Sequence, residues 1–90
     1  MANERKSQDQ LLKELEEAKF KVIIGAYYSH YKHPGEKRYQ VIDVAIYEDT
    51  EEVCVIYKSL TMNALWIRTL VNFLSEVDLG DEKIARFSKI

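Results

Sequence analysis

Apolar side chains near the start of the chain recur with the spacing of a helix. They occupy Leu11, Leu12, Leu15 and Ala18, while lysine and glutamate fill the intervening positions. This pattern predicts an amphipathic helix over residues 7–19. Ser7 followed by Gln10 has the pattern of a capping box at the start of that helix. The polar residues 1–6 are predicted to be disordered.

From Phe20 onward the pattern changes to short apolar runs rich in β-branched and aromatic residues. Strands are predicted over residues 20–24, 26–31, 39–47, 53–59, 65–68 and 84–90. Apolar residues in 70–77 have helical spacing over about two turns, which predicts a brief helix or 3₁₀ segment. His33, Pro34 and Gly35 form a turn by their chemistry.

Residues 39–47 are apolar on both alternating faces, which is typical of a central strand covered on both sides. The element order predicts a mostly β (α+β) fold. In this fold a small SH3-like antiparallel β-barrel, residues 20–90, carries the N-terminal helix and the late helical turn. The predicted core consists of Ile42, Val44, Val55, Ile56, Leu65, Ile67, Leu70, Phe73 and Phe87.

Composition narrows the class of protein. Ninety residues fit a single domain, and 47% hydrophobic with 31% charged residues argues against wholesale disorder. A net charge of -2 argues against indiscriminate DNA binding. The single cysteine, Cys54, lies in an apolar run and is predicted to be buried and unreactive. No signal peptide or membrane-spanning run is apparent, so we expect a cytoplasmic protein with no membrane partner.

Several short motifs resemble one family. They contain Tyr28, His30, Tyr31 and Lys32, then Tyr39 and Val41, Thr50, Val55 and Tyr57, Trp66 and Arg68, Phe73, and finally Arg86 and Phe87. In this order they resemble the bacterial family DUF1653 over about residues 25–90, as a divergent member. His33 and Pro34 replace a glycine of the family pattern, and Thr69 replaces a proline. The resemblance implies a compact, SH3-like β fold and no established activity.

Three candidate chemistries have ordinary structural alternatives. His30 and His33 are three residues apart and point to opposite faces of a strand, which disfavours a metal site. Cys54 with His30 as base would make a nucleophile, but no oxyanion-loop pattern accompanies it. The acidic residues Glu48, Asp49, Glu51 and Glu52 are typical of a solvated turn. The sequence therefore predicts no catalytic residue, no metal site and no cofactor.

The candidate binding residues are aromatic and basic. Tyr28, His30 and Lys32 share one face of their strand, and Trp66 shares a face with Arg68. Such side chains stack on a base, cage a cation or grip a carboxylate. The alternative is that the rings pack under the N-terminal helix and Arg68 pairs with a carboxylate.

These residues favour a small binding module for a polar ligand, peptide or nucleotide, or for a protein partner. The alternative is a structural or self-associating protein, such as a homodimer, with no small-molecule ligand. A hydrolase-type enzyme that uses His30 and a carboxylate is the third hypothesis.

Overall fold

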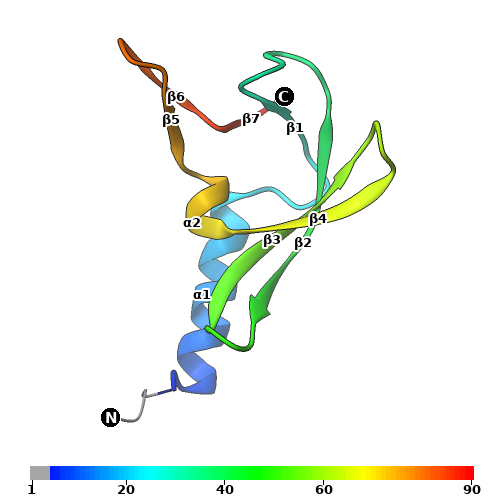
Figure 1. The fold of residues 1–90 in the computed structure, drawn as a ribbon. Coiled ribbons are helices and arrows are strands. Elements are labelled where there is room, and N and C mark those ends of the chain that lie inside the picture. The colour runs from blue at the N-terminus through cyan, green and yellow to red at the C-terminus, as the bar shows by residue number, and fades with distance from the viewer. Residues whose placement is uncertain (1–4) are drawn as a thin grey trace.

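The computed structural model describes residues 5–90 (Figure 1). Within them the chain forms, in order, α1 (Gln8–Lys21), β1 (Tyr27–His30), β2 (Tyr39–Tyr47), β3 (Glu52–Ser59), β4 (Ala64–Thr69), α2 (Leu70–Phe73), β5 (Glu76–Asp78), β6 (Lys83–Ala85) and β7 (Phe87–Lys89). Of the predicted disordered start, residues 1–4 lie outside the described residues. Arg5 and Lys6 are bonded to the buried Glu51, whose carboxylate lies 3.2 Å from Arg5 Nε and accepts the Lys6 N–H at 2.9 Å.

Helix α1 begins at the predicted cap, because Ser7 Oγ accepts the Gln10 N–H at 3.1 Å. The Gln10 side chain donates to Glu14 instead of returning to Ser7, so the reciprocal half of the capping box is absent. The predicted strand over 20–24 is wrong, since the helix continues to Lys21. Its buried side continues the helical spacing from Ala18 to Val22, both fully buried, which leaves Phe20 84% exposed.

The strands are antiparallel and form a five-stranded sheet in the order β4-β3-β2-β1-β7, with β5 and β6 as a separate hairpin. No pairing joins β4 to β7 within residues 5–90, so the structure does not confirm a closed barrel. The predicted last strand is divided at Arg86 into β6 and β7, and β5 replaces the end of the predicted helical segment.

A β-bulge in β2 changes which residues face the core. The register with β3 shifts between Val41 and Asp43, so Ile42 becomes an extra, exposed residue. Val41 faces the core before the bulge, and Val44 and Ile46 face it afterwards. The two apolar faces predicted for residues 39–47 are therefore one core face, interrupted by the bulge.

The core lies on one side of the sheet. Its buried residues are Ala18, Val22, Tyr28, Val41, Val44, Val53, Val55, Tyr57, Phe73 and Phe87. Of the predicted core, Val44, Val55, Phe73 and Phe87 are confirmed, and Ile56 and Leu70 are half-buried. The predictions for Ile42, Leu65 and Ile67 are wrong, because these side chains are exposed.

The pairing of β4 with β3 explains why the core-facing and outward-facing residues of β4 are the reverse of the prediction. Trp66 lies opposite Tyr57 and Arg68 lies opposite Val55, both of which point into the core. Leu65 and Ile67 therefore point away from it. Helices α1 and α2 contribute their buried residues to the same core, so they share one side of the sheet. Within residues 5–90, the outer side of β3 and β4 has no such helix over it. Within the described residues no helix is long and apolar enough to cross a membrane.

Candidate functional site

Aromatic rings from distant parts of the chain meet on the core side of the sheet. Phe73 of α2 stacks on Phe87 of β7 with centroids 4.3 Å apart and an interplanar angle of 6°. Tyr57 meets Phe87 edge-on at 5.5 Å, and His30 does so at 5.1 Å. Such edge-on arrangements are favoured by the ring quadrupoles. The rings form a rigid floor for charged side chains.

Arg68 lies over this floor. Its guanidinium carbon is 5.5 Å from the centroid of Phe87, and its Nε donates to the Tyr57 hydroxyl at 2.9 Å. A second guanidinium nitrogen donates to Asn72 Oδ1. The three partners are a ring, a hydroxyl and an amide, so they fix the orientation of the guanidinium without neutralising its charge.

Arg86 is held by the same turn of chain that holds Arg68. Its Nε donates to Ser75 Oγ at 3.1 Å, and its backbone N–H donates to the Ser75 carbonyl at 2.9 Å. Ser75 Oγ in turn donates to the Asn72 carbonyl at 2.6 Å. Asn72 in α2 and Ser75 just after it therefore position the two arginines from one short segment.

Neither arginine has a carboxylate partner among residues 5–90. The ion pairs found there involve other cations: Arg5, Lys6, Lys19, His33 and Arg38. Arg68 and Arg86 are both half-buried. A partly desolvated positive charge with no counter-ion is unfavourable, and a bound anion would offset that cost.

His30 lies beside these arginines, and its pKa is lowered from the ordinary value of 6.5. Burial is the largest cause, because it disfavours the charged ring. The other causes are nearby positive charges, on Arg68, Lys32, Arg86 and His33. His30 Nδ1 accepts the Lys32 N–H at 3.3 Å, so the neutral ring carries its proton on Nε2.

The lowered pKa makes stability depend on pH. The unfolded chain protonates His30 at a higher pH than the folded chain does, so the free energy of unfolding should fall as pH decreases below about 6.5. We expect His30→Gln to flatten this dependence in urea titrations between about pH 5 and pH 8. His33→Gln, which removes an exposed histidine three residues away, is the control. An unchanged slope in His30→Gln would contradict the assignment.

The structure brings together only part of the predicted site. His30, Trp66 and Arg68 all point to the core side, and Trp66 is 45% exposed there. Tyr28 is buried in the core and accepts the Ile23 N–H with its hydroxyl at 3.1 Å, so its role is structural. Lys32 is exposed, with its Nζ 6.0 Å from the centroid of the Tyr31 ring.

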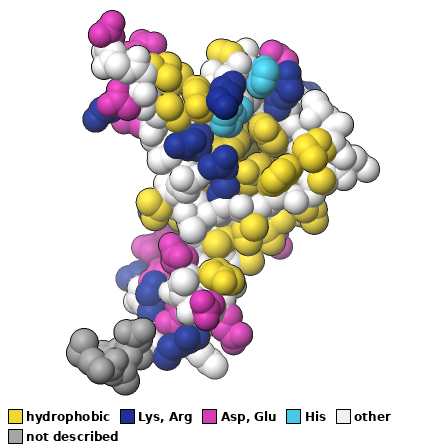
Figure 2. Space-filling model, viewed as in Figure 1, with side chains coloured by type: hydrophobic (Ala, Val, Ile, Leu, Met, Phe, Trp, Pro, Cys, Tyr) yellow, Lys and Arg dark blue, Asp and Glu magenta, His cyan; other side chains and the backbone are white. Residues whose placement is uncertain are grey.

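Arg86 was missed as a site residue, although it belongs to the Arg-Phe motif of the sequence resemblance. We call His30, Trp66, Arg68 and Arg86 the arginine surface. Figure 2 shows arginine or lysine and histidine side chains gathered beside hydrophobic ones, in the hollow between the β5–β6 arm and the main sheet.

The other candidate chemistries lack a suitable arrangement. Cys54 is buried, and burial together with the charge of Glu52 raises the pKa of its thiol. Asp43 is on the outer side of the sheet, where it accepts the Val44 N–H at 2.8 Å. His30 has no carboxylate partner among residues 5–90. No group of three metal-ligating side chains occurs within that range.

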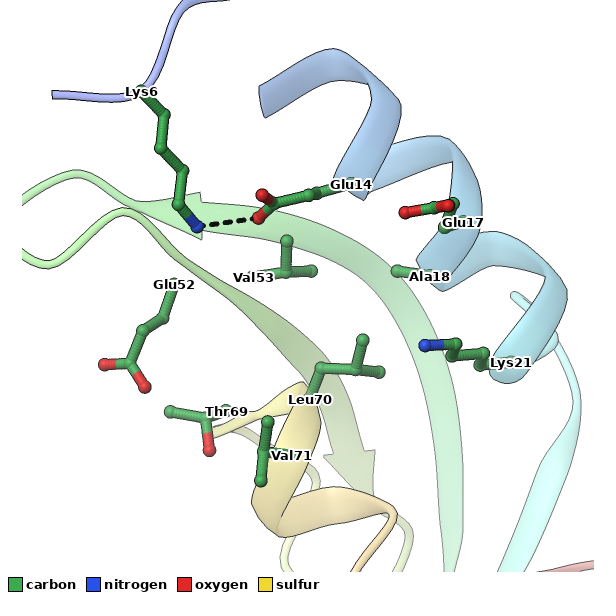
Figure 3. Close-up of a pocket in the computed structure, with 10 residues that line it drawn as sticks. All are labelled: Lys6, Glu14, Glu17, Ala18, Lys21, Glu52, Val53, Thr69, Leu70 and Val71. Carbon is green, nitrogen blue, oxygen red and sulfur yellow. Dashed lines mark hydrogen bonds and ion pairs between the residues drawn. The ribbon is translucent and has the colours of Figure 1, made fainter. Parts of the chain in front are cut away.

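A second hollow lies between α1, α2 and β3 (Figure 3). Val53, Leu70 and Ala18 contribute its apolar part, and the Lys6–Glu14 ion pair at 2.8 Å is on its rim. Its volume of about 250 Å³ is below the usual range for small-molecule sites, about 300–1,000 Å³. Side chains of both signs line it. Two lysines face three glutamates there, so the charges largely offset one another and give the hollow little with which to select a charged ligand.

Several of the residues that carry the sequence resemblance meet at the arginine surface. His30, Trp66, Arg68 and Arg86 form this surface, and Tyr57, Phe73 and Phe87 form the aromatic floor under it. Residues 26–89 match the sequence profile of the family described as Protein of unknown function (DUF1653). The chain belongs to this family. The resemblance is thus confirmed, and α1 lies outside the DUF1653 match as expected. No curated protein and no solved structure matches the chain.

The DUF1653 segment contains both the arginine surface and the residues that support it. Asn72 and Ser75, which hold the arginines, fall within the matched residues. Helix α1 contributes to the core at Ala18, and its C-cap residue Val22 does so as well, but neither lies on this surface. The candidate site is therefore a feature of the matched domain itself.

Proposed function

We propose that this DUF1653 protein is a non-catalytic binding module for an anionic ligand that carries an aromatic ring, with a nucleotide as the ligand class. The observation that carries the proposal is the pair of half-buried arginines, Arg68 and Arg86, held by neutral groups and free of carboxylates within residues 5–90. Two guanidinium groups oriented in this way suit a phosphate, because each presents several N–H donors to its oxygens.

Trp66 would recognise the aromatic ring of the ligand, while the two arginines recognise its phosphate. It shares the core-side face of β4 with Arg68, two residues away, and 45% of its surface is exposed. A base stacked on an exposed aromatic ring contributes about 1–3 kcal/mol. The phosphate is proposed to bind between the arginines while the base stacks on Trp66.

The SH3-like relationship suggested by the sequence also belongs to this proposal. The contact of the Arg68 side chain on edge strand β4 with the Phe87 ring on edge strand β7 supports it, since the two sides of a partly open barrel would face each other in this way. Ligands of small barrels commonly bind on such a concave side.

Removal of one arginine should weaken binding without unfolding the domain. In calorimetric titrations with adenosine monophosphate, we expect Arg86→Gln to bind about 10- to 100-fold more weakly, the effect of losing about 1.5–3 kcal/mol of hydrogen bonding to a charged group. Arg38→Gln is the matched control, because Arg38 already pairs with Glu36 at 3.1 Å and its side-chain hydrogen bonds go to Glu36 and His33, which are not part of the arginine surface. Equal losses in both variants, or no binding by the unmodified protein, would refute the proposal.

Trp66→Ala tests the stacking of the base separately from the binding of the phosphate. It should weaken binding of adenosine monophosphate while leaving the weaker binding of inorganic phosphate unchanged, since phosphate has no ring to stack. The unfolding midpoint of each variant, measured in parallel, shows whether a loss of binding comes from loss of the fold.

A further inference from the structure

Strand β4 is an edge of the main sheet, and its outward backbone groups have no partner among the described residues. Its only neighbour is β3. Apart from the ladder with β3, no backbone hydrogen bond within residues 5–90 reaches Leu65, Trp66, Ile67 or Arg68. An edge of this kind is a template for a strand of another chain.

The register shows which residues of β4 face outward. The Leu60 N–H donates to the Arg38 carbonyl at 2.9 Å, on the side of β2. Lys58, two residues earlier in β3, directs its own backbone groups the same way, and its partner in β4 is Leu65. Leu65 therefore directs its N–H and C=O toward the free edge, and so does Ile67, two residues later.

The side chains of β4 do not protect this edge. Leu65 is 63% exposed and Ile67 is 59% exposed, both on the outer side of the sheet. The strand reads Ala-Leu-Trp-Ile-Arg-Thr and has no proline or lysine. Its one charged side chain, Arg68, points to the core side, where Tyr57 and Asn72 hold it away from the edge. In Figure 2 the β4 backbone crosses the front of the molecule uncovered, with hydrophobic side chains above and below it.

We propose that β4 pairs antiparallel with β4 of a second copy of this chain, about a two-fold axis at Ile67. Ile67 then lies opposite its own copy as a hydrogen-bonded pair, and Leu65 lies opposite Thr69, whose carbonyl is also the first acceptor of helix α2. The outward groups of Ile67 thus find full partners, and Leu65 shares the Thr69 carbonyl with α2. The two sheets join into one, and Leu65 and Ile67 of both copies form a continuous apolar outer face.

The same register places Trp66 opposite Arg68 of the second copy on the core side. An aromatic face beside a guanidinium is a favourable pair, so these side chains as well as the backbone are complementary. Each copy thus adds a tryptophan next to the arginine surface of the other. A self-complementary strand of this kind fits a second copy better than an unrelated strand, because two-fold symmetry satisfies both edges at once.

The surface area that a stable dimer must bury is a modest share of the accessible surface of this chain. A standard interface buries about 800 Å² on each partner, which is about one eighth of the 6406 Å² accessible surface of this chain. Exposed Leu60 and Met62, in the turn that leads into β4, extend the apolar surface beside the edge.

The first test is the mass in solution. Light scattering across micromolar to millimolar concentrations should give twice the 10.6 kDa of one chain, and Ile67→Lys should give a single chain. Val71→Lys is the matched control, because Val71 is exposed on α2 and lies outside the edge; it should remain a dimer. A protein of single-chain mass at every concentration, or a dimer that survives Ile67→Lys, would overturn the proposal.

The second test is the register. In a Cys54→Ser background, Ile67→Cys should form an intermolecular disulfide, because opposed hydrogen-bonded residues have Cα atoms about 5.5 Å apart, within disulfide range. Leu65→Cys should not, because the two copies of Leu65 lie four residues out of register, about 13 Å apart. Crosslinking at residue 65, or at neither position, would exclude a two-fold axis at Ile67.

Discussion

Replacing Phe73 by alanine should lower the free energy of unfolding by about 3–5 kcal/mol, a large part of the stability of a domain of this size. Phe73 is 1% exposed and stacks on Phe87, and its ring also meets Tyr28 at 5.4 Å and Tyr57 at 5.6 Å. These partners come from three different strands. Their separate positions in the sheet prevent them from collapsing into the cavity that alanine would leave.

The matched control is the same substitution at Phe20, which is 84% exposed on α1. Phe20→Ala should change the free energy of unfolding by no more than about 0.5 kcal/mol. Urea denaturation of the two variants beside the unmodified protein measures both effects. Equal midpoints for Phe73→Ala and Phe20→Ala would show that the ring cluster is not the centre of the core.

Removing α1 should abolish cooperative unfolding. The helix covers the sheet with Ala18 and Val22, both fully buried, in the same cluster as Val44 and Val53. A fragment of residues 25–90 would expose this apolar surface, and a chain so short has little other core to compensate for the loss. We expect a broad, non-cooperative transition in urea, with aggregation or binding of a hydrophobic dye.

This truncation also separates two roles for the helix. The fragment contains all of the DUF1653 match, residues 26–89, and the whole arginine surface. If the fragment unfolds cooperatively and binds adenosine monophosphate like the full chain, α1 is only a cover and the prediction is wrong. Full-length protein with Leu12→Ala, a change at an exposed position of the same helix, is the control and should match the unmodified protein.

The order of the elements was largely predictable from sequence, whereas the direction of side chains was not. The predicted bounds of β2 agree with the structure because seven of its nine residues are apolar and four of them are β-branched, in a run of strand length. The sequence pattern does not reveal the bulge at Ile42, because apolar residues occupy both alternating faces of this segment. In β4 both faces are hydrophobic as well, and only the pairing with β3 shows that Trp66 faces inward and Ile67 outward.

The site residues on β1 and β4 could be predicted from the sequence, but Arg86, which completes the site, could not. Trp66 and Arg68 are two residues apart on one strand, so their shared face follows from local geometry. Arg86 comes from another part of the chain, at the break between β6 and β7, and its place beside Arg68 depends on the turn at Asn72 and Ser75. Local periodicity contains no information about contacts of that kind.

The contact between Arg68 and Phe87 affects how the concave side of the sheet can open to a ligand. The Arg68 side chain of β4 reaches the Phe87 ring of β7 at 5.5 Å, and no backbone ladder joins these strands within residues 5–90. A ladder resists opening because several hydrogen bonds must break together, whereas this contact depends on one side chain. Arg68 is held over Phe87 by its hydrogen bonds to Tyr57 and Asn72. A guest that competes for these two bonds can therefore change the opening while every strand keeps its neighbours.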